Sequence, residues 1–92
     1  MLSRIPIDLG KVKKEDTDKE ILRVAISAEL DAVNLYEQLY SAAGDEDIKK
    51  VFLEIAKEEK THIGEFQALL LRKDEEQKRE LEEGRREVEE LI

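Results

Sequence analysis

The sequence predicts an all-α protein: a long antiparallel helical hairpin plus a C-terminal helix, with two copies pairing into an intersubunit four-helix bundle. Charged residues make up 43% of the 92 residues and there is one proline, which suits helices. Apolar residues recur at intervals of three and four along two long segments. There is no cysteine, so a core this small needs a metal or a partner rather than a disulfide to stabilise it.

The first part of the chain, residues 1–16, is expected to form an extended N-terminal arm, because Pro6 and Gly10 interrupt any helical pattern. The hairpin is expected to occupy residues 17–73. Thr17 and Glu20 have the spacing of a capping box, which predicts that the first helix starts near residue 18. Gly44 is expected to end that helix in the left-handed conformation.

The second helix of the hairpin is predicted to begin at Asp45, whose side chain can cap it, and to end near residue 72. Each arm is then about 40 Å long, at about 1.5 Å per residue. Residues 74–92 are predicted to form a charged C-terminal helix with Asp74 as its cap. Apolar residues recur in this part at helical intervals, at Leu81, Val88 and Leu91.

The net charge of −8 argues against nucleic acid and anionic lipid as ligands and favours cations. No apolar run approaches the about 18 residues that span a bilayer, and no secretory signal is recognisable, so we expect a cytoplasmic protein without a membrane partner. The lack of cysteine excludes iron–sulfur clusters, zinc–thiolate sites and cysteine nucleophiles within this chain.

In each hairpin helix, an acidic or imidazole side chain occupies a position at which the apolar periodicity predicts an apolar residue. Glu29 is the sole charge in the stripe of the first helix, and Glu59 and His62 interrupt the stripe of the second. The apolar and aromatic members of the first stripe are Leu22, Ile26, Val33, Tyr36 and Tyr40. Those of the second are Ile48, Phe52, Ile55, Phe66 and Leu69.

These three side chains predict a metal site. No lysine or arginine shares the stripes, so buried charge must be neutralised by a proton or by a cation, and we favour the cation. Glu59 and His62 form a Glu-x-x-His pair, the spacing with which helix bundles hold two carboxylate-bridged metals. Tyr36 is either a core aromatic or a hydroxyl that hydrogen-bonds a ligating carboxylate, and the sequence leaves both interpretations open.

One hairpin supplies half of such a site, because a dinuclear centre takes four carboxylates and two imidazoles. Two copies related by a two-fold axis would supply Glu29, Glu59 and His62 twice. Hard oxygen ligands with one imidazole per metal favour iron, two ions per dimer, with manganese, calcium or zinc as substitutes. The sequence therefore predicts that dimerisation and metal binding occur together.

The segments that carry these residues resemble the encapsulated ferritins, the half-length members of the ferritin-like superfamily, and the rubrerythrins. The resemblance covers residues 18 to 72. It rests on the run AISAELDAVNLYE at 25–37, on AKEEKTH at 56–62, and on the 30-residue separation of Glu29 and Glu59.

The resemblance implies a ferroxidase that oxidises Fe(II) to Fe(III) with dioxygen at a di-iron site across a dimer interface. It implies that Glu59 bridges the irons, that Glu29 is a terminal ligand with His62, that Tyr36 lies next to the ligands, and that Asp31 belongs to an iron-entry region. It also implies a ring of dimers, commonly a decamer, and iron storage inside an encapsulin compartment with the shell protein as partner.

Two other functions remain alternatives. A rubrerythrin-like peroxidase acting in oxidative stress is disfavoured, because the chain lacks the cysteines of an electron-supplying rubredoxin domain. A noncatalytic metal-binding module for helical association is the other.

Overall fold

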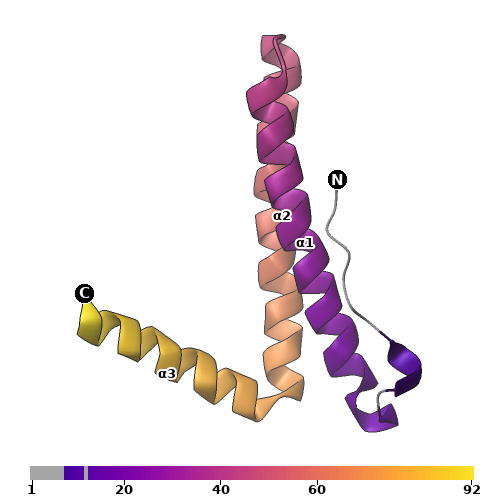
Figure 1. Ribbon diagram of the computed structural model, residues 1–92, viewed down its shortest axis with the longest axis vertical. Helices are drawn as coiled ribbons and strands as arrows, with labels where there is room; N and C mark the ends of the chain where they lie inside the picture. The colour runs from indigo at the N-terminus through magenta and orange to yellow at the C-terminus, as the bar shows by residue number, and fades with distance from the viewer. Residues whose placement is uncertain (1–7, 12) are drawn as a thin grey trace.

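The computed structural model describes residues 8–11 and 13–92, and this part of the chain is helical, without strands. Two short 3-10 turns, Leu9–Lys11 and Lys14–Asp16, precede α1 (Thr17–Ala42), α2 (Glu46–Lys73) and α3 (Glu75–Leu91). Helices α1 and α2 form an antiparallel pair, and α3 turns away from the end of α2 at a steep angle (Figure 1). The prediction of a hairpin followed by a C-terminal helix is confirmed.

The two aspartate caps lie where the sequence predicts them. The carboxylate of Asp45 accepts a hydrogen bond from the backbone N–H of Ile48 at 3.0 Å, at the start of α2. The carboxylate of Asp74 accepts one from the backbone N–H of Gln77, also at 3.0 Å, at the start of α3. Each bond satisfies one of the donors that a helix leaves unpaired at its N-terminus.

The predicted start of α1 near residue 18 is correct to within one residue, but the capping box predicted there does not form. The helix begins at Thr17, its N-terminal flanking residue is Asp16, and no side chain caps it. The Thr17 hydroxyl instead donates to the carbonyl oxygen of Lys13 at 3.3 Å. A preceding 3-10 turn runs directly into α1, so the chain never takes the extended conformation that a capping box requires.

The connection between α1 and α2 also differs from the prediction. No residue in the described part of the chain has a positive φ, so Gly44 does not supply a left-handed stop. The chain leaves α1 through Ala43 in an extended conformation instead. In the arm, the two 3-10 turns replace an extended path over residues 9–11 and 14–16, and the prediction for residues 1–7 and 12 lies outside the described residues.

The core between α1 and α2 is small. Among the described residues, the buried apolar side chains are Val33, Ala56 and Leu70. Ala56 is 1% exposed, so the small side chain lets the helices approach closely, and one turn or more away Tyr36 stacks on Phe52 with ring centroids 6.1 Å apart. The buried core is therefore a narrow strip of contact between α1 and α2.

Many large apolar side chains of the hairpin remain exposed, including two that the sequence places in the second stripe, Ile48 and Leu69, each about half exposed. The others on α1 and α2 are Ile21, Leu30, Leu39, Val51 and Leu53. None of the helices in the described part of the chain combines the length and apolar character that a bilayer-spanning helix needs.

Candidate metal centre

Glu29, Glu59 and His62 converge near the middle of the hairpin. Glu29 comes from α1, and Glu59 and His62 come from consecutive turns of α2. The Nδ1 atom of His62 lies 3.5 Å from Oε2 of Glu29 and 3.5 Å from Oε2 of Glu59. One ligand atom from each residue can be chosen so that all three lie within 4.8 Å of one another. The antiparallel pairing of the helices thus brings the predicted residues together.

The three side chains differ in exposure. The side chains of Glu29 and Glu59 are 22% and 18% exposed, whereas that of His62 is 44% exposed. The expectation that all three are sequestered is therefore wrong for His62 in the single chain. The reason is architectural: two helices can cover only one side of a side chain at their edge, and within residues 8–11 and 13–92 no third helix covers His62.

One carboxylate oxygen of this cluster is buried without a hydrogen-bond partner among the described residues. Oε2 of Glu29 is buried and accepts no hydrogen bond from the described residues. Burying a carboxylate oxygen without a partner is costly, so this position favours a proton or a cation. The neighbouring Nδ1 atom of His62, 3.5 Å away, can donate to this oxygen only when Nδ1 itself carries a proton.

The donor set fits a divalent metal with a preference for oxygen ligands. Two carboxylates and one imidazole without a thiolate suit iron or manganese. The ligand atoms are close enough for small side-chain rotations to bring them onto one ion, and no lysine or arginine forms an ion pair with either glutamate within the described residues. The residues present therefore fit a metal, with Glu29, Glu59 and His62 as the ligands that would hold it.

Tyr36 lies one turn beyond Val33 on α1, and its ring packs across the hairpin on Phe52 of α2 with an interplanar angle of 24°. This contact agrees with the interpretation of Tyr36 as a core aromatic. A hydrogen bond from its hydroxyl to a ligating carboxylate stays a prediction.

Asp31, assigned to an iron-entry region, is partly buried but does not belong to the group of side chains that the hairpin brings together. It is two residues from Glu29, so at about 100° per residue the two side chains point about 160° apart around α1. A role for Asp31 in iron entry stays a prediction.

The structure adds a cross-hairpin contact that the spacing did not reveal. Lys60, between the two α2 ligands in sequence, forms an ion pair with Glu37 of α1 at 3.3 Å. Both side chains are about half exposed, so the pair contributes little to stability. No sequence pattern could have indicated it, because the partners lie on different helices and each reads as an ordinary surface charge.

Comparisons with known proteins show the family and the fold of the chain. The rubrerythrin family model matches residues 20–91. The crystal structure of the encapsulated ferritin domain from Pyrococcus furiosus superposes with a TM-score of 0.84 and is 51% identical, covering 96% of this chain and 88% of that one.

Two curated relatives extend the comparison. A ferritin-like–encapsulin shell fusion protein of Pyrococcus furiosus is 58% identical over 93 residues, which cover 99% of this chain and 27% of that protein. The encapsulin nanocompartment cargo protein EncC of Myxococcus xanthus is 39% identical over 69 residues, which cover 72% of this chain and 53% of that protein. The chain thus spans about a quarter of the length of the first relative and about half of the second.

Proposed function

The chain belongs to the rubrerythrin family, in the encapsulated-ferritin group of ferritin-like proteins, and on that premise we propose that it is a ferroxidase with Fe(II) as substrate. Iron bound between carboxylates would give its electrons to dioxygen and leave as Fe(III). The observation that carries the proposal is the convergence of Glu29, Glu59 and His62 around a buried oxygen that lacks a hydrogen-bond partner among the described residues.

The protein's part in this reaction is charge neutralisation and positioning. The two carboxylates together offset the charge of one divalent ion, and their placement on facing helices holds the ion between α1 and α2. An ion held between the carboxylates and Nδ1 of His62 would need the Nδ1 lone pair free, so any proton on Nδ1 must leave when the ion arrives.

We propose further that the complete centre holds two irons between two copies of the chain. Two hairpins would supply four carboxylates and two imidazoles. The exposed edge of His62, together with the exposed side chain of Val51 about three turns away on the same face of α2, supports a second copy on this face. A ring of such dimers, commonly a decamer, is the larger assembly that we propose.

The extent of exposed surface supports association. The chain exposes 7347 Å², whereas a folded monomer of 10.7 kDa exposes about 5,500 Å². A standard interface covers about 800 Å² on each partner, so the surplus is large enough for more than one interface per chain.

The names of the relatives support the place of action. Because one relative is a fusion to an encapsulin shell and another is an encapsulin cargo protein, we propose that this chain works inside an encapsulin compartment in the cytoplasm. The shell protein would be its partner, and the compartment would store the Fe(III) that the centre produces.

Stopped-flow absorbance tests the activity. Protein loaded anaerobically with Fe(II) is mixed with air-saturated buffer, and formation of Fe(III) is followed. Wild-type protein should oxidise iron rapidly, and Glu29→Ala and His62→Ala should lose the fast phase. Glu54→Gln, a change at an exposed glutamate of α2, is the matched control and should behave as wild type. Oxidation at the wild-type rate by either ligand variant would remove the assignment.

A peroxidase is the second candidate, because the matching family model is that of rubrerythrin. The same site would then reduce hydrogen peroxide with electrons from an external donor, since this chain contains no cysteine to bind a rubredoxin-type iron. Peroxide consumption with an added donor, compared with oxygen consumption by Fe(II)-loaded protein, distinguishes the two. Elemental analysis of protein purified without chelator separates iron from manganese.

A further inference from the structure

Asp74 connects all three long helices through one side chain. It is the residue between α2 and α3, and its Oδ1 atom accepts the capping hydrogen bond from the backbone N–H of Gln77 in α3. Its Oδ2 atom accepts a hydrogen bond from Nη2 of Arg23 in α1 at 2.6 Å. Asp74 is 9% exposed and is the buried charged residue among those described. Both carboxylate oxygens of Asp74 therefore accept a hydrogen bond, one from the start of α3 and one from α1.

Apolar packing does little to hold α3 at its angle. Where α3 leaves the hairpin, Leu81 faces Ile26 of α1 and Leu70 of α2 across a cavity of about 270 Å³ rather than filling the space between them. Leu81 remains 43% exposed. The hydrogen bond between Arg23 and Asp74 spans the same junction between the hairpin and α3.

Helix α3 does not need that contact to stay helical. Arg85 pairs with Glu82 and with Glu89, and Arg86 pairs with Glu83, all within α3 at intervals of three or four residues. Pairs at these intervals stabilise a helix without any contact to the rest of the protein. The helicity of α3 and its orientation are therefore separable properties.

We propose that Arg23 and Asp74 form an elbow lock that sets the direction in which α3 leaves the hairpin. The lock holds α3 over the part of the hairpin that Gln67 and Leu70 line. Gln67 lines the cavity beneath α3, and it is five residues from His62, so the two side chains point about 140° apart around α2. The lock thereby keeps the apolar residues of α3 away from the face on which, if the proposed function holds, a second copy completes the metal site.

The lock depends on the charge of Asp74. The hydrogen bond from the backbone N–H of Gln77, followed by the interactions with Arg23 and Lys19, holds the pKa of Asp74 below its ordinary value of 3.8. A lowered pKa means that the lock is intact above the ordinary pKa and is lost as the pH falls through the lowered one.

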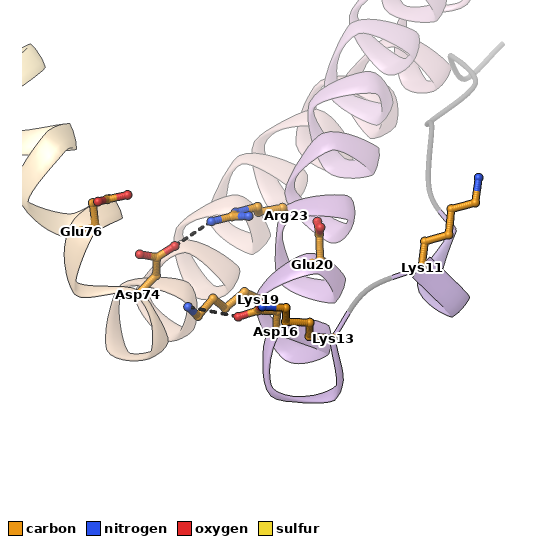
Figure 2. Close-up of a pocket in the computed structure, with 8 residues that line it drawn as sticks. All are labelled: Lys11, Lys13, Asp16, Lys19, Glu20, Arg23, Asp74 and Glu76. Atoms are coloured by element: carbon orange, nitrogen blue, oxygen red, sulfur yellow. Dashed lines mark hydrogen bonds and ion pairs between the residues drawn. The ribbon is translucent and has the colours of Figure 1, made fainter.

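Figure 2 shows Arg23 and Asp74 pointing at each other across the base of the hairpin, with Lys19 directed toward Asp16. Other charged side chains lie near Arg23 and Asp74. A substitution, and not a change of pH alone, is therefore needed to test the lock. The other charged side chains that line this pocket are Lys11, Lys13, Asp16, Lys19, Glu20 and Glu76.

Distance measurements between spin labels test the lock directly. The chain has no cysteine, so Asn34→Cys on α1 and Glu87→Cys on α3 place two labels at exposed positions in an otherwise unchanged protein. Labelled protein is diluted with unlabelled protein so that only distances within one chain are measured, without metal. The parent should give a single narrow distance distribution at neutral pH.

Arg23→Gln should lose that narrow peak while circular dichroism shows unchanged helix content. Asp74→Asn, which keeps a capping side chain but removes the charge, should do the same, and Arg23→Lys should retain the peak at least in part. The matched control is Arg86→Gln, which removes an arginine pair inside α3 and should leave the distribution narrow. The parent itself should keep the peak as the pH reaches the ordinary pKa of aspartate and should lose it only when the pH falls through the lowered pKa of Asp74.

A narrow distribution in Arg23→Gln, or equal broadening in Arg86→Gln, would overturn the proposal. Because the distances are measured without metal, failure of the ferroxidase proposal would leave this result standing.

Discussion

Nδ1 of His62 on α2 lies 3.5 Å from Oε2 of Glu29 on α1, a buried oxygen that accepts no hydrogen bond from the described residues. This contact joins the two helices at a point where an apolar core would normally form. A protein gains little stability from such an arrangement without a cation, because each carboxylate loses water on burial. The burial of these carboxylates destabilises the metal-free protein, and this supports a function in binding a cation.

Removing the charge of Glu29 should weaken metal binding without weakening the fold. Glu29→Gln should lower the affinity for Mn²⁺ by at least about tenfold, since even residues that only support ligands contribute that much. The metal-free variant should unfold no earlier than wild type, because a buried charge is gone. Titration calorimetry and thermal unfolding measure the two effects. Glu54→Gln is the control, and unchanged affinity in Glu29→Gln would exclude it as a ligand.

Metal should stabilise the protein and change its mass in one step. At a free concentration of 100 times Kd, one bound ion adds about 2.7 kcal/mol to the free energy of unfolding. For a domain of this size the melting temperature should rise by roughly 10 to 20 °C. Differential scanning calorimetry and light scattering on the same sample follow both changes, and a chelator should reverse them. A melting temperature and a mass that do not change on metal addition would instead indicate a noncatalytic helical association module that binds no metal.

The ring and the hydroxyl of Tyr36 should have separate roles, with the ring packing in the core and the hydroxyl supporting the metal site. Tyr36→Phe keeps the stack on Phe52, so the free energy of unfolding should change by less than about 0.5 kcal/mol. If the hydroxyl orients a ligating carboxylate, metal affinity should fall by about tenfold. Tyr36→Ala should destabilise the protein as well. Wild-type affinity in Tyr36→Phe would leave packing as the whole role of the residue.

The close approach of α1 and α2 depends on Ala56, which is 1% exposed. Ala56→Leu should destabilise the protein by about 1–3 kcal/mol, because the larger side chain forces the helices apart. It should also weaken metal binding, since Glu59 follows one turn later on the same helix. Urea denaturation measures the first effect, with the exposed position Ala68→Leu as control, expected within about 0.5 kcal/mol of wild type. Equal effects of the two substitutions would contradict the packing argument.

The features that local spacing determines were predictable from the sequence. The two long helices follow from apolar residues at intervals of three and four, and the caps at Asp45 and Asp74 from aspartates directly before them. The convergence of Glu29, Glu59 and His62 was predictable as well, because a short connection forces antiparallel helices to pair face to face. Each signal acts within a few residues or through one short loop.

Prediction from the local sequence was wrong where a segment can adopt more than one local conformation. Thr17 has the sequence of a capping residue, but the 3-10 turn before it lets its hydroxyl bond to Lys13 instead. Gly44 permits a left-handed residue without requiring one, and the chain turns through Ala43 in an extended conformation. A residue type allows a local conformation, whereas the path of the chain on either side selects it.

By itself, the sequence determined the helices, the hairpin and the identity of the three candidate ligands, because periodicity and short connections act locally. Only the tertiary structure decided that Arg23 meets Asp74 across 51 residues of chain, that α3 leaves the hairpin at a steep angle, and that His62 keeps an exposed edge. These properties depend on the angle and distance between whole helices. That geometry is set by all the packing contacts together, and no short stretch of sequence records it.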